Sequence, residues 1–223
     1  DFVLFVTPSP KPFYLQKINY AITIMDICHR DFPEFSEVSE YNIFSLREKL
    51  LHSCLGPSTF AIVESEDLKN KISTQFNKSK DRILVFPNTT SPYLINQKNN
   101  DLDMNFKKFD INDNFLFYPA QFWEHKNHIR IILAIKKLKE KGKKLSVVFC
   151  GSDKGNKKFI KKKIKEYGLE KEIKVLGFVK FSELHALYSN CKAVVMPTYF
   201  GPTNIPPLDA WYYKKPLIYS SHL

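Results

Sequence analysis

The sequence predicts an α/β protein made of two domains, each a doubly wound parallel sheet with helices packed on it. Three observations predict this fold class. Short apolar runs typical of strands alternate strictly with helical patterns along the chain, and such alternation implies parallel sheets. A polar stretch at 91–112 separates one series from another. The 223 residues are 43% hydrophobic, which suffices for two small cores.

The first domain is expected at 1–90, followed by a linker at 91–112. Its strands are expected at 2–6, 20–26, 59–64 and 82–87. Helices are expected at 40–54, where apolar residues recur at helical spacing, and at 65–76, where Ser65 fits an N-cap position. The chain begins at Asp1 without a methionine and the series lacks opening strands. We therefore expect this domain to be truncated at its start.

The second domain is expected at 113–223. Its strands are expected at 115–119, 145–150, 173–178, 193–197 and 217–219, and its helices at 125–141, 157–166, 182–190 and 207–214. Ligands of open parallel sheets bind beyond the carboxyl ends of the strands, and loops with binding candidates follow several of these strands. The series stops directly after a strand, so we expect its terminal helices to be missing.

The segment at 193–220 predicts the most about binding. Pro206 and Pro207 fit a first helical turn, where the missing N–H groups have no intrahelical partner. The preceding loop therefore offers backbone amides beside a positive helix end, which suits a phosphate or a sugar hydroxyl. The residues concerned are Gly201, Thr203, Asn204 and Ile205. Alternatively, the Thr203 and Asn204 side chains make only local turn bonds.

Asp209 is expected within the first turn of the same helix. A carboxylate there can accept hydrogen bonds from the two hydroxyls of a vicinal diol, such as that of a ribose. It can equally serve only as a partner for the positive end of the helix. The local pattern leaves both interpretations open.

A second segment, at 114–128, reads as a strand, a turn and a helix start. A lysine near a helix start meets the positive end of the dipole, so the placement of Lys126 makes sense if an anion lies between them. A plain surface lysine is the alternative. Phe122 and Trp123 could fill the core or face a sugar. His125 and His128 lie three positions apart without a third ligand, so we expect no metal site.

Four segments in the correct order resemble retaining glycosyltransferases of family four, the glycosyl transferases group 1, which have the GT-B fold. The family's donor loop has two acids separated by seven residues; here Gly201 replaces the first and Asp209 keeps the second in kind. The family's diphosphate-binding Arg is replaced by Gln121. Its Lys-Asn pair is matched by Lys126 and Asn127.

The third matching segment lies at 171–197. The family seats the nucleobase at the end of a strand in this segment. The corresponding residues are Gly177, Phe178 and Val179. The resemblance implies that their backbone reads the edge of the base.

The fourth segment, at 23–37, is similar to the acceptor-side His-Asp segment of these enzymes. Asp26 and His29 match it and are acceptor-binding candidates, whereas Met25 stands where the family has its His. A local alternative is that Arg30 forms an ion pair with the acid one or four positions further along.

The resemblance implies transfer of a hexose-type sugar from a nucleotide sugar to a hydroxyl acceptor, a glycan or lipid-linked glycan, with retention. The nucleotide would bind the second Rossmann-like domain, and the acceptor would approach from the first. Lys126 and the helix end at Pro206 would stabilise the leaving diphosphate, and Asp209 would hold the ribose. The nucleotide sugar is a substrate, and neither a metal nor another cofactor is expected.

Two other functions stay open. Gln121, Gly201 and Met25 depart from the family at functional positions, which is compatible with a catalytically silent sugar-nucleotide-binding protein. The net charge of +11 is concentrated in lysines at 136–144 and 157–166. These runs are compatible with a basic membrane-surface interaction module, or with an ordinary solvated face. No nucleic-acid motif is recognised, so no nucleic-acid partner is expected.

The four cysteines are widely scattered without paired spacing. This pattern favours a reducing compartment over a disulfide-bonded scaffold. No apolar run approaches the ~20 residues that span a bilayer. We therefore expect a cytoplasmic protein, with peripheral contact to the inner membrane face as a further expectation.

Overall fold

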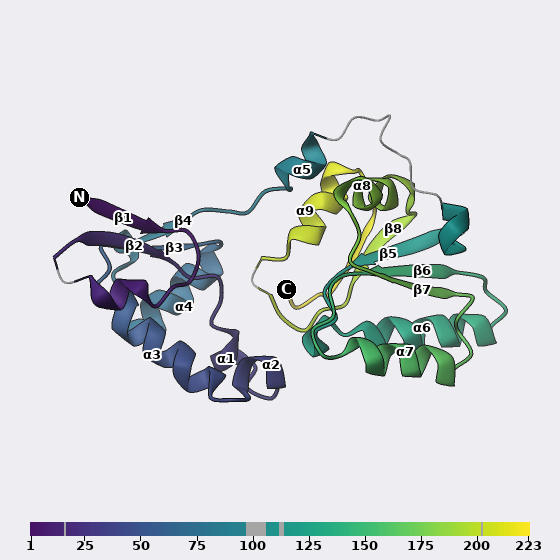
Figure 1. Ribbon diagram of the computed structural model, residues 1–223, viewed down its shortest axis with the longest axis horizontal. Helices are drawn as coiled ribbons and strands as arrows, with labels where there is room; N and C mark the ends of the chain where they lie inside the picture. The colour runs from purple at the N-terminus through teal and green to yellow at the C-terminus, as the bar shows by residue number, and fades with distance from the viewer. Residues whose placement is uncertain (16, 97–105, 112–113, 202) are drawn as a thin grey trace. The chain divides into compact units, whose positions relative to one another are not determined.

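The computed structural model of the protein describes residues 1–15, 17–96, 106–111, 114–201 and 203–223 (Figure 1). The chain divides into two compact units. Unit 1 comprises Asp1–Asn88 together with Phe200–Thr203, and unit 2 comprises Thr89–Tyr199 together with Asn204–Leu223. Each unit contains one parallel sheet, as the alternation of strands and helices predicts.

Unit 1 has a four-stranded sheet with the order β1-β2-β3-β4. Its strands are β1 (Phe2–Phe5), β2 (Asn19–Thr23), β3 (Phe60–Val63) and β4 (Ile83–Val85). Its helices are α1 (Cys28–Asp31), α2 (Ser36–Ser39), α3 (Ile43–Leu55) and α4 (Glu66–Phe76), with 3-10 turns at Lys11–Tyr14 and Lys80–Arg82. All four strands and both long helices expected here are confirmed to within a few residues.

The core of unit 1 lies between the sheet and the helices α3 and α4. Ile22 and Val63 of the sheet are fully buried against Leu55 of α3 and Ile72 of α4. The expected helix cap is confirmed, because the Ser65 side chain accepts a hydrogen bond of 3.2 Å from the Leu68 backbone N–H. Both helices therefore pack into one apolar cluster with the sheet.

Unit 2 has a five-stranded sheet with the order β7-β6-β5-β8-β9. Its strands are β5 (Phe115–Pro119), β6 (Ser146–Cys150), β7 (Ile173–Gly177), β8 (Ala193–Met196) and β9 (Leu217–Tyr219). Its helices are α5 (Pro92–Ile95), α6 (His128–Glu140), α7 (Lys157–Glu166), α8 (Phe181–Asn190) and α9 (Ile205–Tyr212), with 3-10 turns at Phe106–Phe109 and Glu124–Lys126. The expected strands and helices of the second series are confirmed.

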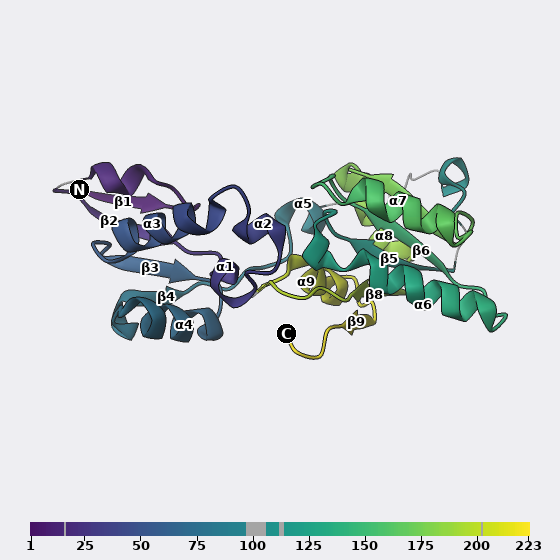
Figure 2. The same ribbon diagram turned by 90° about the horizontal axis from the view of Figure 1, so that it is seen from below.

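Helices cover both faces of this sheet, as a doubly wound fold requires. Figure 1 shows α6 and α7 side by side on one face, and α8 and α9 on the other; Figure 2 shows the same elements after a quarter turn. Successive strand residues point to opposite faces. Phe117 therefore packs with the α8 side, whereas Tyr118 packs with the α6 side, and both are fully buried.

The polar stretch expected as a linker contributes to unit 2 in its described parts. Leu94 of α5 and Ile111 are buried in the cluster that contains Phe117. Apolar residues spaced among many polar ones anchor this stretch to the sheet, which its average composition conceals. Residues 97–105, 112 and 113 of the expected linker lie outside the described residues.

All four cysteines are buried free thiols. Burial raises the thiol pKa to about 12 for Cys28 and Cys150 and to about 11 for Cys191. The Cys54 thiol pKa is also raised by burial. Thiols with such pKa values stay protonated near neutral pH, and a protonated thiol is a poor nucleophile.

His128 opens α6 inside the core of unit 2. Its ring stacks on Phe122 at 4.6 Å and lies 4.7 Å from the Tyr118 ring. Neither ring nitrogen has a hydrogen-bond partner of good geometry among the described residues, although the Ala120 backbone opposes in part the effect of burial on the His128 pKa. Burial lowers the His128 pKa to about 3, so the ring is a neutral core aromatic at physiological pH.

Replacing His128 with Phe should make the protein less sensitive to acid. The unfolded chain binds a proton at this ring below pH ~6.5, whereas the folded chain binds it only near pH 3. Native stability is therefore lost as the pH falls below ~6.5, by up to about 1.4 kcal/mol per pH unit. Urea unfolding at pH 7.5 and 5.0 should show His128→Phe gaining about 2 kcal/mol on the native protein at the lower pH.

A matched change at a non-titrating ring beside His128 in the same core, Phe149→Leu, should shift the free energy of unfolding by the same amount at both pH values. If His128→Phe shifts stability equally at both pH values, the ring does not titrate differently in the two states.

Candidate functional site

The strand order of unit 2 places its polar loops at one point. Successive strands run outward from β5 through β6 to β7, and the chain then returns to β8 on the other side of β5. Ligands of such sheets bind where the order reverses, beyond the carboxyl ends of the strands. Here that point lies between the loop after β5 and the loop after β8.

Backbone and side-chain hydrogen bonds join these two loops. The Tyr199 backbone N–H donates to the His125 carbonyl at 2.8 Å, and the Thr198 hydroxyl donates to the same oxygen at 3.2 Å. The Asn127 side-chain amide donates to the Pro197 carbonyl at 3.0 Å. The loop after β5 is thereby fixed against the loop after β8.

Lys126 and Asn204 meet at this junction. The Lys126 Nζ donates to the Asn204 side-chain oxygen at 2.8 Å. The Asn204 side-chain nitrogen donates to the Tyr219 hydroxyl at 2.8 Å. Behind them, the Tyr118 hydroxyl donates to the Lys126 carbonyl at 2.5 Å. Two predicted site residues, from loops about 80 positions apart, are therefore in direct contact (Lys126 and Asn204).

Tyr219 is a site residue that the sequence analysis missed. It lies at the end of β9, and burial raises the pKa of its hydroxyl, so the hydroxyl stays protonated near neutral pH. The only signal in the sequence was its place at the carboxyl end of a strand. Its contact with Asn204 depends on tertiary structure.

The two large aromatic residues of the loop after β5 lie in different environments. Phe122 is fully buried and belongs to the core. Trp123 is half-buried, and its indole N–H donates to the Gln121 side-chain oxygen at 2.9 Å. Gln121, which stands in place of the family's Arg, is exposed and supplies no cation. Asn127 caps α6 in the left-handed conformation, with φ of 56°.

The end of β7 has a geometry suited to close approach by a ligand. Gly177 has φ of +80°, a conformation that side chains disfavour. A side chain at this position would also lie 3.0 Å from the Nζ of Lys157, which starts α7. Phe178 is 81% exposed, whereas Val179 packs against the core. The predicted nucleobase position thus has a buried glycine, whose carbonyl accepts a hydrogen bond of 2.7 Å from the Gly151 N–H, and a neighbouring cation.

The position of Asp209 differs from the expectation. Helix α9 begins at Ile205, so Asp209 lies in its second turn and the predicted first-turn placement is wrong. Its side chain is buried and accepts a hydrogen bond of 3.1 Å from the Tyr188 hydroxyl. Burial raises the Asp209 pKa to about 6, although Tyr188 and Thr90 lower it in part. The carboxylate is directed toward α8, and its ribose contact stays a prediction.

The remaining residues of the predicted donor loop belong to different units. Asn204 and Ile205 start α9 in unit 2. Gly201 and Thr203 belong to unit 1, where the Thr203 hydroxyl accepts a hydrogen bond of 3.4 Å from Asn88. Gly201 has φ of +134°, which favours glycine at the position of the family's first acid.

Unit 1 holds the acceptor-side candidates. Asp26 follows β2, and its carboxylate accepts a hydrogen bond of 2.9 Å from the Cys28 backbone N–H and one from the Arg47 guanidinium. Arg47 also donates to the Asp26 carbonyl at 3.0 Å. Met25 is 41% exposed and lines, with Asp26 and Arg47, a cavity of about 200 Å³. Asp26 is thereby oriented beside a small pocket.

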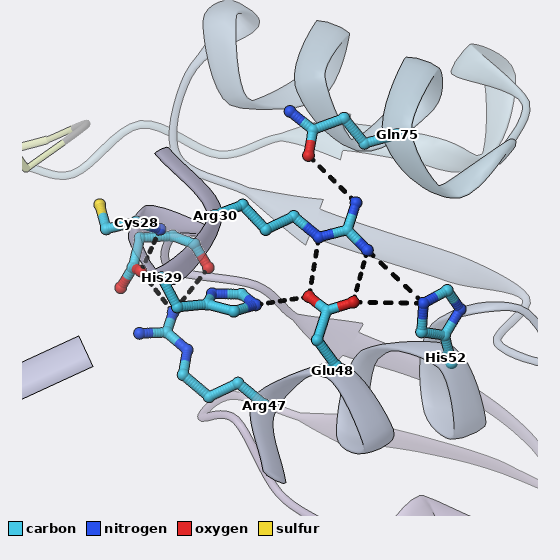
Figure 3. Close-up of polar contacts among 8 residues, drawn as sticks. Cys28, His29, Arg30, Arg47, Glu48, His52 and Gln75 are labelled. Carbon is cyan, nitrogen blue, oxygen red and sulfur yellow. Dashed lines mark hydrogen bonds and ion pairs between the residues drawn. The ribbon is translucent and has the colours of Figure 1, made fainter. Parts of the chain in front are cut away.

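Glu48 of α3 organises the segment that follows Asp26 (Figure 3). Its two oxygens accept hydrogen bonds from Arg30 at 2.7 and 2.6 Å, and one oxygen lies 2.7 Å from the buried His29 ring. Arg30 first, and then His29, hold the Glu48 pKa at about 2, whereas burial lowers the His29 pKa. Arg30 therefore pairs with a distant acid, and the alternative of a local ion pair with Asp31 or Glu34 is wrong.

Two observations concern metal ligands and membrane-spanning helices. Among the residues that the structure describes, no group of three His, Cys, Asp or Glu side chains could hold a metal ion. No helix in the described part of the chain is long and apolar enough to cross a bilayer.

Comparison with known proteins identifies the family. The family model of the glycosyl transferases group 1 matches residues 99–223. The chain belongs to this family. An uncharacterized glycosyltransferase of Methanocaldococcus jannaschii is 22% identical over 187 residues, which cover 80% of this chain and 47% of the relative. The chain therefore spans about half the length of that curated relative.

Several solved structures share the fold of this chain. Anabaena HepE in complex with UDP-glucose superposes with a TM-score of 0.75 at 16% identity, over 99% of this chain and 60% of HepE. WaaG, a glycosyltransferase involved in lipopolysaccharide biosynthesis, gives 0.73 at 15% identity, over 99% of this chain and 59% of WaaG. The likeness confirms the expected GT-B fold of two Rossmann-like sheets.

Asp209→Asn should stabilise the protein at neutral pH. The folded pKa of about 6 exceeds the ordinary 3.8, so the stabilising effect of protonation is complete below pH 3.8 and is lost as the pH rises through 6. At pH 7.5 the native protein holds an ionised buried carboxylate, and Asn avoids this at a gain of about 1–3 kcal/mol. The free energy of unfolding at pH 7.5 and 5.0 measures it.

Glu170→Gln removes an acid that is exposed and should change stability little at either pH. The UDP affinity of Asp209→Ala tests the ribose prediction separately, since an unchanged affinity would leave Asp209 with a structural role only.

Proposed function

We propose that the protein containing this chain is a glycosyltransferase that moves a sugar from a nucleotide-sugar donor to a hydroxyl acceptor. The observation that carries the proposal is the contact of Lys126 with Asn204 at the point where the strand order of unit 2 reverses. A cation beside the start of α9 offers two positive groups to one diphosphate. UDP-glucose bound to HepE makes a UDP-sugar the first donor to test.

In this proposal Lys126 acts on the leaving group. As the bond to the sugar breaks, charge builds on the diphosphate, and a fixed ammonium lowers the energy of that state. Asn204 accepts a hydrogen bond of 2.8 Å from the Lys126 Nζ, and Tyr219 in turn accepts one from Asn204. A bound diphosphate would take the place of the Asn204 oxygen as the partner of Lys126, and Asn204 would become available to a sugar hydroxyl.

The finer features of the reaction follow the family resemblance. We propose transfer of a hexose-type sugar with retention, without a protein nucleophile or a metal. We also propose that Asp26, oriented by Arg47, binds a hydroxyl of a glycan or lipid-linked acceptor. The proposed location is the cytoplasm, with peripheral contact to the membrane that carries such acceptors.

A catalytically silent nucleotide-sugar binder is the second candidate. The observation favouring it is Gln121, whose side chain is bonded to Trp123 and supplies no charge. Turnover separates the two functions. Incubation of the whole protein with UDP-, GDP- and ADP-sugars and a pool of glycan acceptors should release a nucleoside diphosphate and a glycosylated product if it is an enzyme, whereas binding without product supports the silent binder.

Lys126→Ala should weaken binding of a nucleoside diphosphate by roughly 1.5–3 kcal/mol, the range for a charge-assisted hydrogen bond. Binding of the nucleoside without phosphates should change little, because Lys126 is assigned to the phosphates. Calorimetric titration with UDP and uridine measures both affinities. Lys137→Ala, at an exposed position of α6, is the matched control, and equal losses for UDP and uridine in Lys126→Ala would show that Lys126 is only structural.

Asn204→Ala should change the preference among donors that carry the same nucleotide, because Asn204 is assigned to the sugar. Rates with UDP-glucose, UDP-galactose and UDP-N-acetylglucosamine measure this preference. Tyr219→Phe removes the hydroxyl that receives the Asn204 bond and should change it in the same direction but less. An unaltered preference in both variants, together with activity gained in an inert parent by Gly201→Glu, would favour the silent binder.

A further inference from the structure

Most of the net positive charge of this chain lies in one part of unit 2. The segment 136–172 contains fourteen lysines, no arginine and five acidic residues, and therefore a net charge of +9 out of +11 for the whole chain. The other 186 residues are nearly balanced. This segment runs from the second half of α6 through β6 and α7 to the start of β7. The excess of lysines over acidic residues is therefore concentrated in this segment and is not spread evenly along the chain.

Part of this charge surrounds a cavity. Four lysines line a cavity of about 360 Å³ where α6 ends and β6 and β7 begin. We call this surface the basic end of unit 2, and its lysines are Lys139, Lys143, Lys144 and Lys171. A cavity of this size is large enough for a phosphate with a small polar group attached.

Most of the charge at the basic end is uncompensated. Lys139 pairs with Glu172 at 2.9 Å and also donates to the Gly168 carbonyl. In contrast, Lys143, Lys144 and Lys171 are exposed and form no close ion pair in the described part of the chain, although Lys171 acts electrostatically on Asp110, which pairs with Lys174. Three cations therefore face solvent around one cavity, while the single acid in its wall is already neutralised.

The composition of the surface favours a bilayer over a nucleic acid. Arginine, which supplies the forked contacts to phosphates and bases, is absent from the whole segment. Two aromatic rings of the segment are accessible, Tyr167 and the 45% exposed Phe159. Lys136 and Lys163 lie over Tyr167 at 4.7 and 5.6 Å, and Lys163 lies over Phe159 at 5.8 Å, so neither ring is a free stacking platform for bases. Clustered lysines without stacking groups are typical of attraction to anionic lipid headgroups.

The location of the basic end is compatible with simultaneous substrate binding. The cavity lies at the amino ends of β6 and β7, whereas Lys126, Gly177 and Asn204 follow the carboxyl ends of strands. Because the strands are parallel, all of them start on one side of the sheet and end on the other, so these two sets of residues lie on opposite sides. A bilayer bound at the amino ends of the strands therefore leaves the loops after their carboxyl ends accessible to substrates.

We propose that the basic end of unit 2 docks the protein on an anionic phospholipid bilayer, with a headgroup phosphate in the cavity bounded by Lys143, Lys144 and Lys171. This docking surface does not require the proposed sugar transfer, because none of its residues belongs to the proposed nucleotide site. Each lysine close to an anionic bilayer strengthens binding about fivefold. The three exposed lysines together should therefore account for about a 100-fold stronger partition to anionic vesicles.

The test uses the whole protein and vesicles of phosphatidylcholine with or without phosphatidylglycerol. The variant Lys143→Gln, Lys144→Gln, Lys171→Gln should lose about 100-fold in partition to the anionic vesicles. The matched control removes three exposed lysines of unit 1, by Lys17→Gln, Lys49→Gln, Lys80→Gln, and should lose less than about fivefold. Both should keep the native melting temperature and UDP affinity.

Three results would overturn the proposal. Equal losses in the two triple variants would show attraction by net charge alone, and equal binding to neutral vesicles would exclude a headgroup charge. Tighter binding to a DNA duplex than to anionic vesicles at the same salt concentration would identify a nucleic acid as the partner. Because UDP affinity is measured in the same samples, failure of the proposed transferase function would be seen separately.

Discussion

The position of β5 in the centre of its sheet decides where chemistry can take place in unit 2. Because the chain builds outward from β5 in one direction and then crosses to β8, the loops after these two strands leave the sheet side by side. The hydrogen bonds to the His125 carbonyl fix that arrangement. A lysine, an asparagine and a tyrosine from three separate strand ends can then converge, which no local pattern could arrange.

Both units hold their polar segments by groups whose charge state the fold imposes. In unit 1, Glu48 is kept ionised by Arg30, and it ties the short helix α1 to α3. In unit 2, the pKa of Asp209 is shifted in the opposite direction. Burial disfavours its charged form, and only Tyr188 and nearby polar groups oppose that effect. The lowered pKa of Glu48 therefore reflects a strong ion pair, whereas the raised pKa of Asp209 reflects burial that disfavours its charged form.

The sequence was sufficient for elements with strong local signals. The predicted bounds of α7 agree with the structure because two isoleucines four positions apart among lysines define one buried face, with Ile160 and Ile164 inside. The helices α1 and α2 escaped prediction because four residues are too few for a period to be seen. The Tyr219 contact and the burial of Asp209 escaped it because their causes lie 15 and 21 positions away in the chain.

The buried thiols make this protein well suited to measurements of motion. Each native sulfhydryl is enclosed by the core, and its high pKa keeps it protonated, so maleimide reagents that need a thiolate would pass it by. A cysteine placed on the surface of each unit would accept a fluorophore without prior removal of the native ones. Energy transfer between the two dyes would then report how the separation of the units changes when a nucleotide is added.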